Sequence, residues 1–434
     1  MIRTIQIVFA IILTSFYLFP FEFTFLPGVN TKMAMAGVGL VVLGFQLGRA
    51  RNSIFSKDMV TISAYAMLVS LIGFCAVAYN ETRDYSYATY VISMWVWLSA
   101  AYATIMYIRK VHGYVTLELV CNYLIAVCIL QCISAMLIQY IPFVKNIVNE
   151  YIGTMSGMGR GSASALDNRG RLYGIGAALD IAGSRFAAIM VIIMYLSRKV
   201  QFNNSSRKVW IYCFSFIIIG LIGNMISRTT TVGILLALLF LVFDLIMKIG
   251  TQSNTSIFRP LLIIGSIGII IILYLYSHNA LFYDNIRFAF EGFFSLFEHG
   301  EWSTNSTDIL ESMYRFPTTT KTWLIGDGYM TNPSRTDPYY VGFPWKGFYM
   351  GTDVGYLRFI YYFGLIGLYA FSTFMYKVTT ICIKRHPQYN YLFWWILLLN
   401  FIIWLKVSTD IFLILALFLV ISKEENDEHE KSII

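Results

Sequence analysis

Apolar segments of membrane-spanning length recur along almost the whole chain, and they limit its possible folds more than any other feature. A helix of about 20 apolar residues crosses the roughly 30 Å hydrocarbon layer of a bilayer. Ten such segments can be delimited, at 4–20, 33–48, 59–79, 87–107, 115–140, 179–197, 209–227, 229–247, 260–277 and 355–376. The short segments of alternating polarity that build transmembrane β-barrels do not occur in the sequence. We therefore predict an all-α polytopic membrane protein.

The composition agrees with a surface that faces lipid. Of the 434 residues, 57% are hydrophobic and 13% are charged, whereas soluble domains are about 45–50% apolar and about 25% charged. The formal charge of +8 is explained by basic residues that flank membrane spans. We therefore expect membrane lipid, and no nucleic acid, as a partner.

The last apolar run, 391–421, determines the number of spans. As one helix it would be roughly 46 Å long, and Lys406 and Asp410 would lie within it at a cost of about a few kcal/mol each. A tight hairpin that turns between these two residues avoids that cost and gives about twelve spans, whereas a single tilted helix gives eleven. We favour the hairpin. Residues 1–434 are then a single integral membrane domain.

Basic residues in short loops set the orientation, because such loops stay in the cytoplasm. They are Arg49, Arg51, Lys57, Arg109, Lys110, Arg198, Lys199, Arg207, Lys208, Lys384 and Arg385. Their alternation predicts that both termini are cytoplasmic, including the acidic tail 422–434. Two long connections then face outward: 141–178, and 278–354 between spans nine and ten.

Arginines gather at the predicted outer boundary. Arg185, Arg228 and Arg358 lie within about a turn of it on apolar helices, and the two outer loops are themselves basic. A single arginine there could extend its charged end to the headgroups. Three of them, beside two basic loops, indicate an anionic ligand at the outer leaflet.

The larger outer loop has its own expected elements. Four phenylalanines at helical spacing in 281–297 predict one helix lying in the membrane interface. Asp308 and Glu311 have the spacing of an N-terminal capping pair, and GDGY at 326–329 predicts a turn. An aromatic stretch follows that suits either a headgroup belt or a wall for sugars; its members are Tyr339, Tyr340, Phe343, Trp345, Phe348 and Tyr349.

A set of motifs follows the ninth span in a fixed order. Arg315 begins RFPTTTKTWLIG, which ends at Gly326, and Gly328 completes a GxG. Asp353 then begins DVGYL, and a Gly-x-x-Gly follows at Gly364 in the tenth span. Earlier in the chain stand two further sequences, Ser227-Arg228-Thr229 and RLYGIGAALDIAG from Arg171.

In this order, and with this number of spans, the motifs resemble the O-antigen polymerase and ligase superfamily, and its Wzy-type polymerase family in particular. The resemblance implies a glycosyltransferase of the bacterial inner membrane that polymerises undecaprenyl-pyrophosphate-linked repeat units of O-antigen, capsule or exopolysaccharide on the periplasmic face. It implies no cofactor and no metal ion, and the donor, the acceptor, a chain-length regulator and a flippase as partners. The alternatives are an O-antigen ligase that transfers glycan to a lipid acceptor, and a flippase or transporter of lipid-linked saccharides.

The same resemblance assigns roles to individual residues. Arg228 and Arg315 are candidates to stabilise the leaving pyrophosphate, and the alternative is ion pairing with loop carboxylates such as Glu301 or Asp308. Asp353 is a candidate general base, or a cap for the tenth span, at a position where ligases carry histidine. The expected substrate-binding residues are Arg160, Arg171, Arg185, Arg358, Gly326, Gly328, Tyr356 and Trp345.

Overall fold

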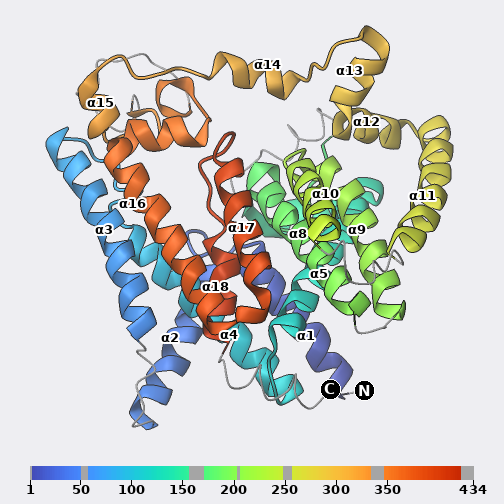
Figure 1. Ribbon diagram of the computed structural model, residues 1–434, viewed down its shortest axis with the longest axis horizontal. Helices are drawn as coiled ribbons and strands as arrows, with labels where there is room; N and C mark the ends of the chain where they lie inside the picture. Colours follow the sequence, from blue (N-terminus) through green and yellow to red (C-terminus); the bar gives the residue numbers. More distant parts are fainter. Residues whose placement is uncertain are drawn as a thin grey trace. The chain divides into compact units, whose positions relative to one another are not determined.

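The structure is a computed structural model that describes residues 2–49, 57–155, 171–202, 206–247, 257–333 and 347–421 (Figure 1). Every predicted span coincides with a helix. These helices are α1 (Ile2–Leu18), α2 (Thr31–Arg49), α3 (Lys57–Tyr79), α4 (Tyr90–His112), α5 (Leu117–Tyr140), α8 (Leu179–Phe202), α9 (Ser206–Ile226), α10 (Thr230–Met247), α11 (Phe258–His278), α16 (Gly355–Arg385), α17 (Asn390–Ile403) and α18 (Phe412–Val420). Within the described ranges, eight are long and apolar enough to cross a membrane: α3, α4, α5, α8, α9, α10, α11 and α16. The predicted all-α class is therefore confirmed, with eight helices suited to span a membrane, and the number of about twelve spans stays a prediction.

The chain forms two compact units, a division that the hydropathy pattern does not reveal. Unit 1 comprises Met1–Val38, Ala100–Trp302 and Ile421–Ile434, and unit 2 comprises Gly39–Ser99 and Ser303–Val420. Two of the four boundaries fall within helices, α2 and α4, and the other two follow Trp302 and Val420.

Unit 1 is built around α8. Every side chain from Ala182 to Met194 is buried, and the helix packs against α9 and α10. Close packing depends on small residues, because a Cβ atom on Gly233 of α10 would overlap the backbone of Ala187. The helix α8, which begins at Leu179, eight residues after Arg171, is thus deeply buried in unit 1.

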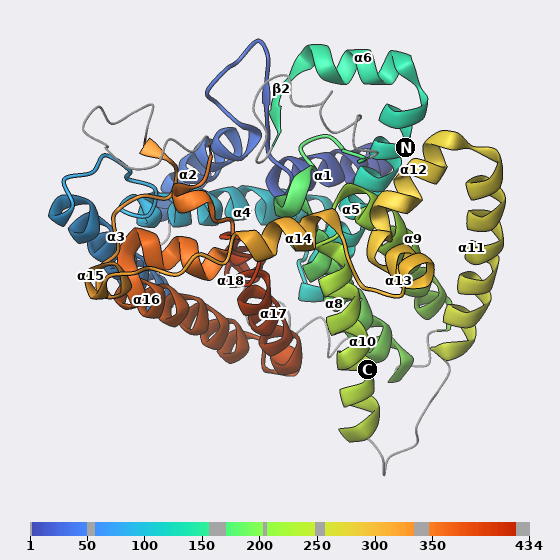
Figure 2. The ribbon, with the colours of Figure 1, turned by 90° about the horizontal axis from the view of Figure 1, so that it is seen from above.

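A two-stranded antiparallel sheet, which the sequence did not predict, closes one end of unit 1. Strand β1 (Phe21–Phe23) follows α1 and pairs with β2 (Ile152–Met155). The strand β2 continues directly from α6 (Pro142–Tyr151), as Figure 2 shows. The connections after α1 and α5 therefore lie at the same end of this unit.

The single interfacial helix predicted over 281–297 is wrong in one respect. The segment forms two helices, α12 (Ala280–Ala289) and α13 (Glu291–His299). Phe290 breaks the run because its backbone (φ −118°, ψ 27°) leaves the helical region. Its carbonyl then accepts hydrogen bonds from the N–H groups of Phe293 and Phe294, which starts the second helix.

Unit 2 is built around α16, which packs against α3, α17 and α18. Two short helices precede it, α14 (Asn305–Ser312) and α15 (Thr320–Leu324). The predicted capping pair Asp308 and Glu311 is corrected, because α14 begins earlier and Thr304 is its N-cap, accepting from the Thr307 N–H. A threonine four residues before the proposed cap, Asp308, offers the same oxygen acceptor.

The predicted interruption between Lys406 and Asp410 is confirmed, since α17 ends at Ile403 and α18 begins at Phe412. Side chains and local contacts satisfy the non-helical backbone between them. The Trp404 indole donates to the Thr409 carbonyl at 2.8 Å, and the Asn400 side-chain oxygen accepts from the Ile411 N–H at 3.1 Å. Irregular backbone among apolar helices is tolerated only when its polar groups are paired in this way.

In each unit, the connections that the charge pattern assigns to one side contact one another. Asp58 and Arg385 pair at one end of unit 2, while the 80–89 loop meets 326–331 at the other end. In unit 1, Glu118 and Lys208 pair across two loops of the basic set. Alternating loops therefore lie at opposite ends, as expected when successive helices cross a membrane in opposite directions.

Cysteine labelling tests which end faces the cytoplasm. In a Cys75→Ser background, which removes the exposed native thiol, a membrane-impermeant maleimide should label Ser303→Cys on intact spheroplasts. It should label Lys110→Cys only after lysis, because Lys110 belongs to the basic set. The reverse pattern would invert the orientation.

Candidate active site in two arginine clusters

The first cluster, in unit 1, forms where three chain segments meet. Ser227–Thr229 connect α9 to α10, as predicted. Arg171 lies beside the end of α9, where its Nε donates to the Ile226 carbonyl at 2.8 Å. Leu172 donates its backbone N–H to the Met225 carbonyl at 3.0 Å. The residues ahead of α8 thus satisfy carbonyls that α9 leaves open at its C-terminus.

Phe288 of α12 brings two of the predicted arginines together. The guanidinium carbon of Arg228 lies 4.4 Å from the ring centroid, and that of Arg171 lies 5.5 Å from the same centroid. An aromatic face attracts a guanidinium and fixes its plane. Two guanidinium groups on one ring form a site suited to binding phosphate oxygens.

Two carboxylates balance this charge. Glu291, the first residue of α13, forms an ion pair with Arg228. Asp180 accepts hydrogen bonds from the Ser227 and Thr229 hydroxyls at 3.0 and 2.8 Å. It also lies 3.8 Å from the Arg171 guanidinium. We call these five residues the Phe288 cluster: Arg171, Asp180, Arg228, Phe288 and Glu291.

Ion pairing of Arg228 with a loop carboxylate was the alternative to a catalytic role, and the structure contains such a pair. Its partner is Glu291, rather than Glu301 or Asp308. The pair does not decide between the roles, because a bound phosphate can replace a carboxylate on a guanidinium.

Arg185 lies elsewhere in unit 1. It is on α8, its side chain is only 5% exposed, and its guanidinium lies 5.7 Å from the centroid of Phe19. The structure therefore gives Arg185 a different aromatic partner from Arg171 and Arg228.

The second cluster, in unit 2, surrounds a bend in α16. Phe363 and Gly364 leave the helical conformation, and Gly364 adopts a φ of +68°. The bend frees the carbonyls of Tyr361 and Tyr362, which accept from the N–H groups of Asp327 and Gly328 at 2.6 and 3.0 Å. The predicted GDGY turn thus lies against the bend and supplies donors to its open carbonyls. We call this turn, residues 326–329, the wedge.

The two glycines of the wedge are required by close approach. Gly326 and Gly328 have φ values of +84° and +74°, which only glycine adopts readily. Their carbonyls accept from the side chains of Asn80 and Thr82 in the α3–α4 loop, at 3.2 and 2.9 Å. This geometry gives the glycines a structural role, and their predicted role in substrate binding stays a prediction.

Gly326→Ala is expected to destabilise the protein by about 2–4 kcal/mol. A Cβ atom there would lie 2.5 Å from the carbonyl of Tyr362, in a backbone conformation that alanine adopts at a cost. Thermal unfolding in detergent measures the loss. Gly300→Ala is the matched control, because Gly300 has a similar φ of +77° but no atom within 4 Å of the added Cβ. Equal melting temperatures for the two variants would contradict the close approach.

Asp353 lies at the start of α16, but the N-cap position belongs to Val354. The Asp353 carboxylate instead lies 3.4 Å from the guanidinium of Arg358. Arg358 also donates to the Met330 carbonyl at 3.2 Å and stacks on Phe348, 4.2 Å from the ring centroid. Asp353 and Arg358, both predicted site residues, therefore form one ion pair.

Arg315 is exposed, and it contacts the turn that follows Phe348. Its guanidinium lies 3.5 Å from the Met350 carbonyl, and its own carbonyl accepts from the Tyr361 hydroxyl at 3.1 Å. Tyr349 of the same turn packs on Tyr361. We call Arg315, Phe348, Asp353 and Arg358 the α16 cluster, since the 348–351 turn connects them.

Tyr356 faces the α17 end rather than this turn. Its N–H donates to the Trp404 carbonyl, and its hydroxyl donates to the Phe401 carbonyl at 3.0 Å. Its predicted role as a substrate ligand stays a prediction. The other two predicted ligands, Arg160 and Trp345, lie outside the described residues, as does the acidic tail 422–434.

Two polar residues that hold the 326–331 segment and the 348–351 turn in place were missed from the sequence. Asp84 accepts from the N–H groups of Met330 and Thr331 at 2.8 and 3.2 Å, which holds the wedge to the α3–α4 loop. Asp327 accepts from Lys321 at 2.8 Å and from the Tyr349 hydroxyl at 3.3 Å. The GDGY motif contains Asp327 and could have indicated it, whereas no sequence pattern pointed to Asp84.

The fold and these clusters define a helical membrane protein with arginine and aromatic sites at the ends of its helices. Among the described residues, no three His, Cys, Asp or Glu side chains are grouped so that they could hold a metal ion. Comparison with protein-family models, curated proteins and solved structures finds no match.

Proposed function

We propose that this protein is a glycosyltransferase of the bacterial inner membrane that polymerises polysaccharide repeat units carried on undecaprenyl pyrophosphate. The observation that carries the proposal is the Phe288 cluster. Arg171 and Arg228 share one aromatic ring at the ends of apolar helices. A pyrophosphate on a membrane lipid presents its charge at the same level, just beyond the hydrocarbon.

The chemistry needs charge stabilisation more than new bonds to the protein. As the sugar leaves the carrier, negative charge grows on the pyrophosphate, and fixed guanidinium groups stabilise it without rearrangement. In this proposal Arg228 and Arg315 stabilise the leaving group. Arg171, Arg185 and Arg358 assist in binding the anionic substrate.

The acceptor hydroxyl must lose its proton as the glycosidic bond forms. Asp353 is the proposed base, and Arg358 beside it stabilises the charged carboxylate that can accept a proton. The reaction is proposed to need no metal ion. About twelve spans, both termini in the cytoplasm, and the loop 278–354 on the periplasmic face complete the proposal.

A reconstituted assay tests the function. Purified protein in vesicles is incubated with undecaprenyl-pyrophosphate-linked repeat units, and the products are separated by size. A ladder of glycans with one to many repeats is expected, and it should persist with excess chelator. Single transfer to a different lipid would favour the ligase. Movement of the lipid across the bilayer without bond formation would favour a flippase and overturn the proposal.

A further inference from the structure

Helix α6 has an apolar side that the protein only half covers. Val148 is buried, and with Val144 it packs on a small core formed by Ile138, Tyr173 and Ala178. Phe143 and Ile147 directly precede these two valines in the sequence, so their side chains point about 100° away around the helix. Both are exposed, and Phe143 is 72% accessible. The polar residues Lys145, Asn146, Asn149 and Glu150 fill the other half of the helix circumference, where Lys145 lies opposite the two exposed apolar residues and Glu150 lies next to Phe143. This division of a short helix is typical of one that lies in a membrane interface.

A neighbouring loop extends the exposed apolar strip. The N–H of Thr24 donates to the Tyr151 carbonyl at 2.9 Å, so the chain after β1 is fixed to the end of α6. Just beyond it, Phe25 is 71% accessible and stacks on Phe23, and Leu26 is exposed as well. Two segments far apart in the sequence thus present apolar side chains at the same end of unit 1.

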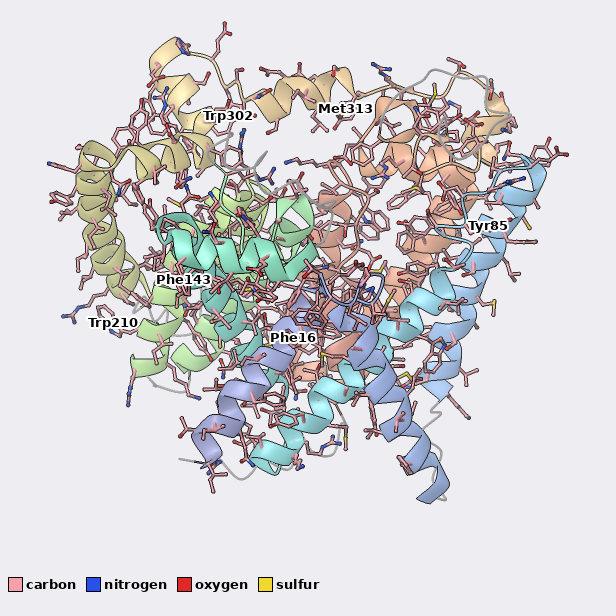
Figure 3. All side chains as sticks on the ribbon, turned by 180° about the vertical axis from the view of Figure 1, so that it is seen from behind. Phe16, Tyr85, Phe143, Trp210, Trp302 and Met313 are labelled. Carbon is pink, nitrogen blue, oxygen red and sulfur yellow. The ribbon has the colours of Figure 1, made fainter. Side chains whose placement is uncertain are left out.

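The strip continues the outer face of a membrane-spanning helix. Along α5, Ile133 and Leu137 are exposed at a four-residue spacing, and Ile141 continues that line just after the helix ends. Pro142 then begins α6, which lies across the long helices of this unit in Figure 3, where Phe143 is labelled. A stripe suited to lipid therefore runs without interruption into the exposed side of α6.

We propose that α6 and the loop Phe23–Leu26 form an anchor that lies in the boundary between lipid headgroups and hydrocarbon. The occupant of the apolar strip is bilayer lipid, because the strip begins where a spanning helix ends and because polar residues cover the other side of α6. Lys145 and Asn149 on that side meet headgroups and water.

The anchor has a consequence for the Phe288 cluster. The inner side of α6 packs on Tyr173, two residues after Arg171. The anchor therefore sets the depth of the segment that carries Arg171, and it holds this arginine close to the level of lipid phosphates.

Spin labelling of the full-length protein tests the anchor. In a Cys75→Ser background, a nitroxide is attached to Phe143→Cys or to Lys145→Cys, and the protein is placed in phosphatidylethanolamine–phosphatidylglycerol vesicles. Collisions with oxygen, which concentrates in hydrocarbon, and with a water-soluble nickel chelate are then measured. The oxygen-to-nickel ratio should be about fivefold or more higher at position 143, because an interfacial helix buries its apolar face by roughly 5–10 Å.

The two positions are matched, since they lie two residues apart on opposite faces of α6, and both are at least partly exposed. Phe25→Cys, on the other segment of the anchor, should behave like Phe143→Cys. High nickel accessibility at both α6 positions would place the helix in water and overturn the proposal. Protection of position 143 from both reagents would show a protein partner there instead of lipid, and would also overturn it.

Discussion

Replacing Arg228 by lysine is expected to slow glycan transfer about a hundredfold, or roughly 3 kcal/mol, while the protein stays in the membrane at normal levels. Lysine keeps the charge but loses the planar fork and its stacking on Phe288, 4.4 Å away. Arg315→Lys should cause a loss of similar size. The rate of ladder formation in reconstituted vesicles measures both.

Arg287→Lys is the matched control for Arg228→Lys. Arg287 also stacks on a phenylalanine, with its guanidinium carbon 4.6 Å from the Phe294 centroid. It also pairs with a glutamate, Glu298, through a second contact of 2.9 Å, and this pairing lowers the pKa of Glu298. It is not a predicted site residue, so its variant should transfer glycan at close to the normal rate. If all three lysine variants are equally active, the arginines have no role in the reaction.

Asp353→Asn is expected to reduce transfer by about 10²–10⁴-fold. Asparagine has nearly the same shape and can still accept a hydrogen bond from Arg358, but it cannot take a proton from an acceptor hydroxyl. The loss should appear in turnover, while binding of the lipid-linked donor, measured separately, should change little. Melting temperature checks that the lost ion pair has not unfolded the helix start.

Asp327→Asn distinguishes a lost base from a lost ion pair. Asp327 is also partly buried and paired with a basic side chain, with its carboxylate 2.8 Å from Lys321. Its hydrogen bonds from Thr322 and Tyr349 already occupy it. A small effect at Asp327 beside a large one at Asp353 is the expected result. Normal turnover of folded Asp353→Asn protein would exclude Asp353 as the base.

The spans were predictable because hydropathy over about 20 residues is a property of the segment itself. The break between α17 and α18 was predictable for the same reason, since Lys406 and Asp410 are costly in lipid. The bend at Gly364 was not, because one glycine in an apolar helix is ordinary. Helix α16 bends here because the wedge, residues 326–329, supplies N–H donors to the carbonyls that the bend frees.

Local patterns in the outer loops were less informative. Strand β1 has three residues, too few to show the alternation by which a strand is recognised, and its partner lies more than a hundred residues away in the sequence. The break at Phe290 could not be predicted, because the helical spacing of the phenylalanines continues across it. Helix α6 went unnoticed because its ten residues mix an apolar side with a polar one.

The candidate site was predicted in its residue types but not in its partners. Motif order singled out Arg171, Arg228 and Arg315, yet it could not indicate that Phe288 would carry two of them. Choice of partner depends on tertiary contacts, and no spacing rule relates Arg228 to Glu291. The separation of the predicted residues into two units likewise has no local signal.

The wedge at the bend of α16 limits how this chain can be recombined with others. Surface loops usually tolerate exchange because water satisfies their backbone. Here the carbonyls of Tyr361 and Tyr362 depend on N–H groups of Asp327 and Gly328. A chimera that received a foreign loop would leave two buried acceptors unpaired, at about 1–3 kcal/mol each. Segments α15 and α16 must therefore be transplanted as one block, together with the α3–α4 loop that holds them.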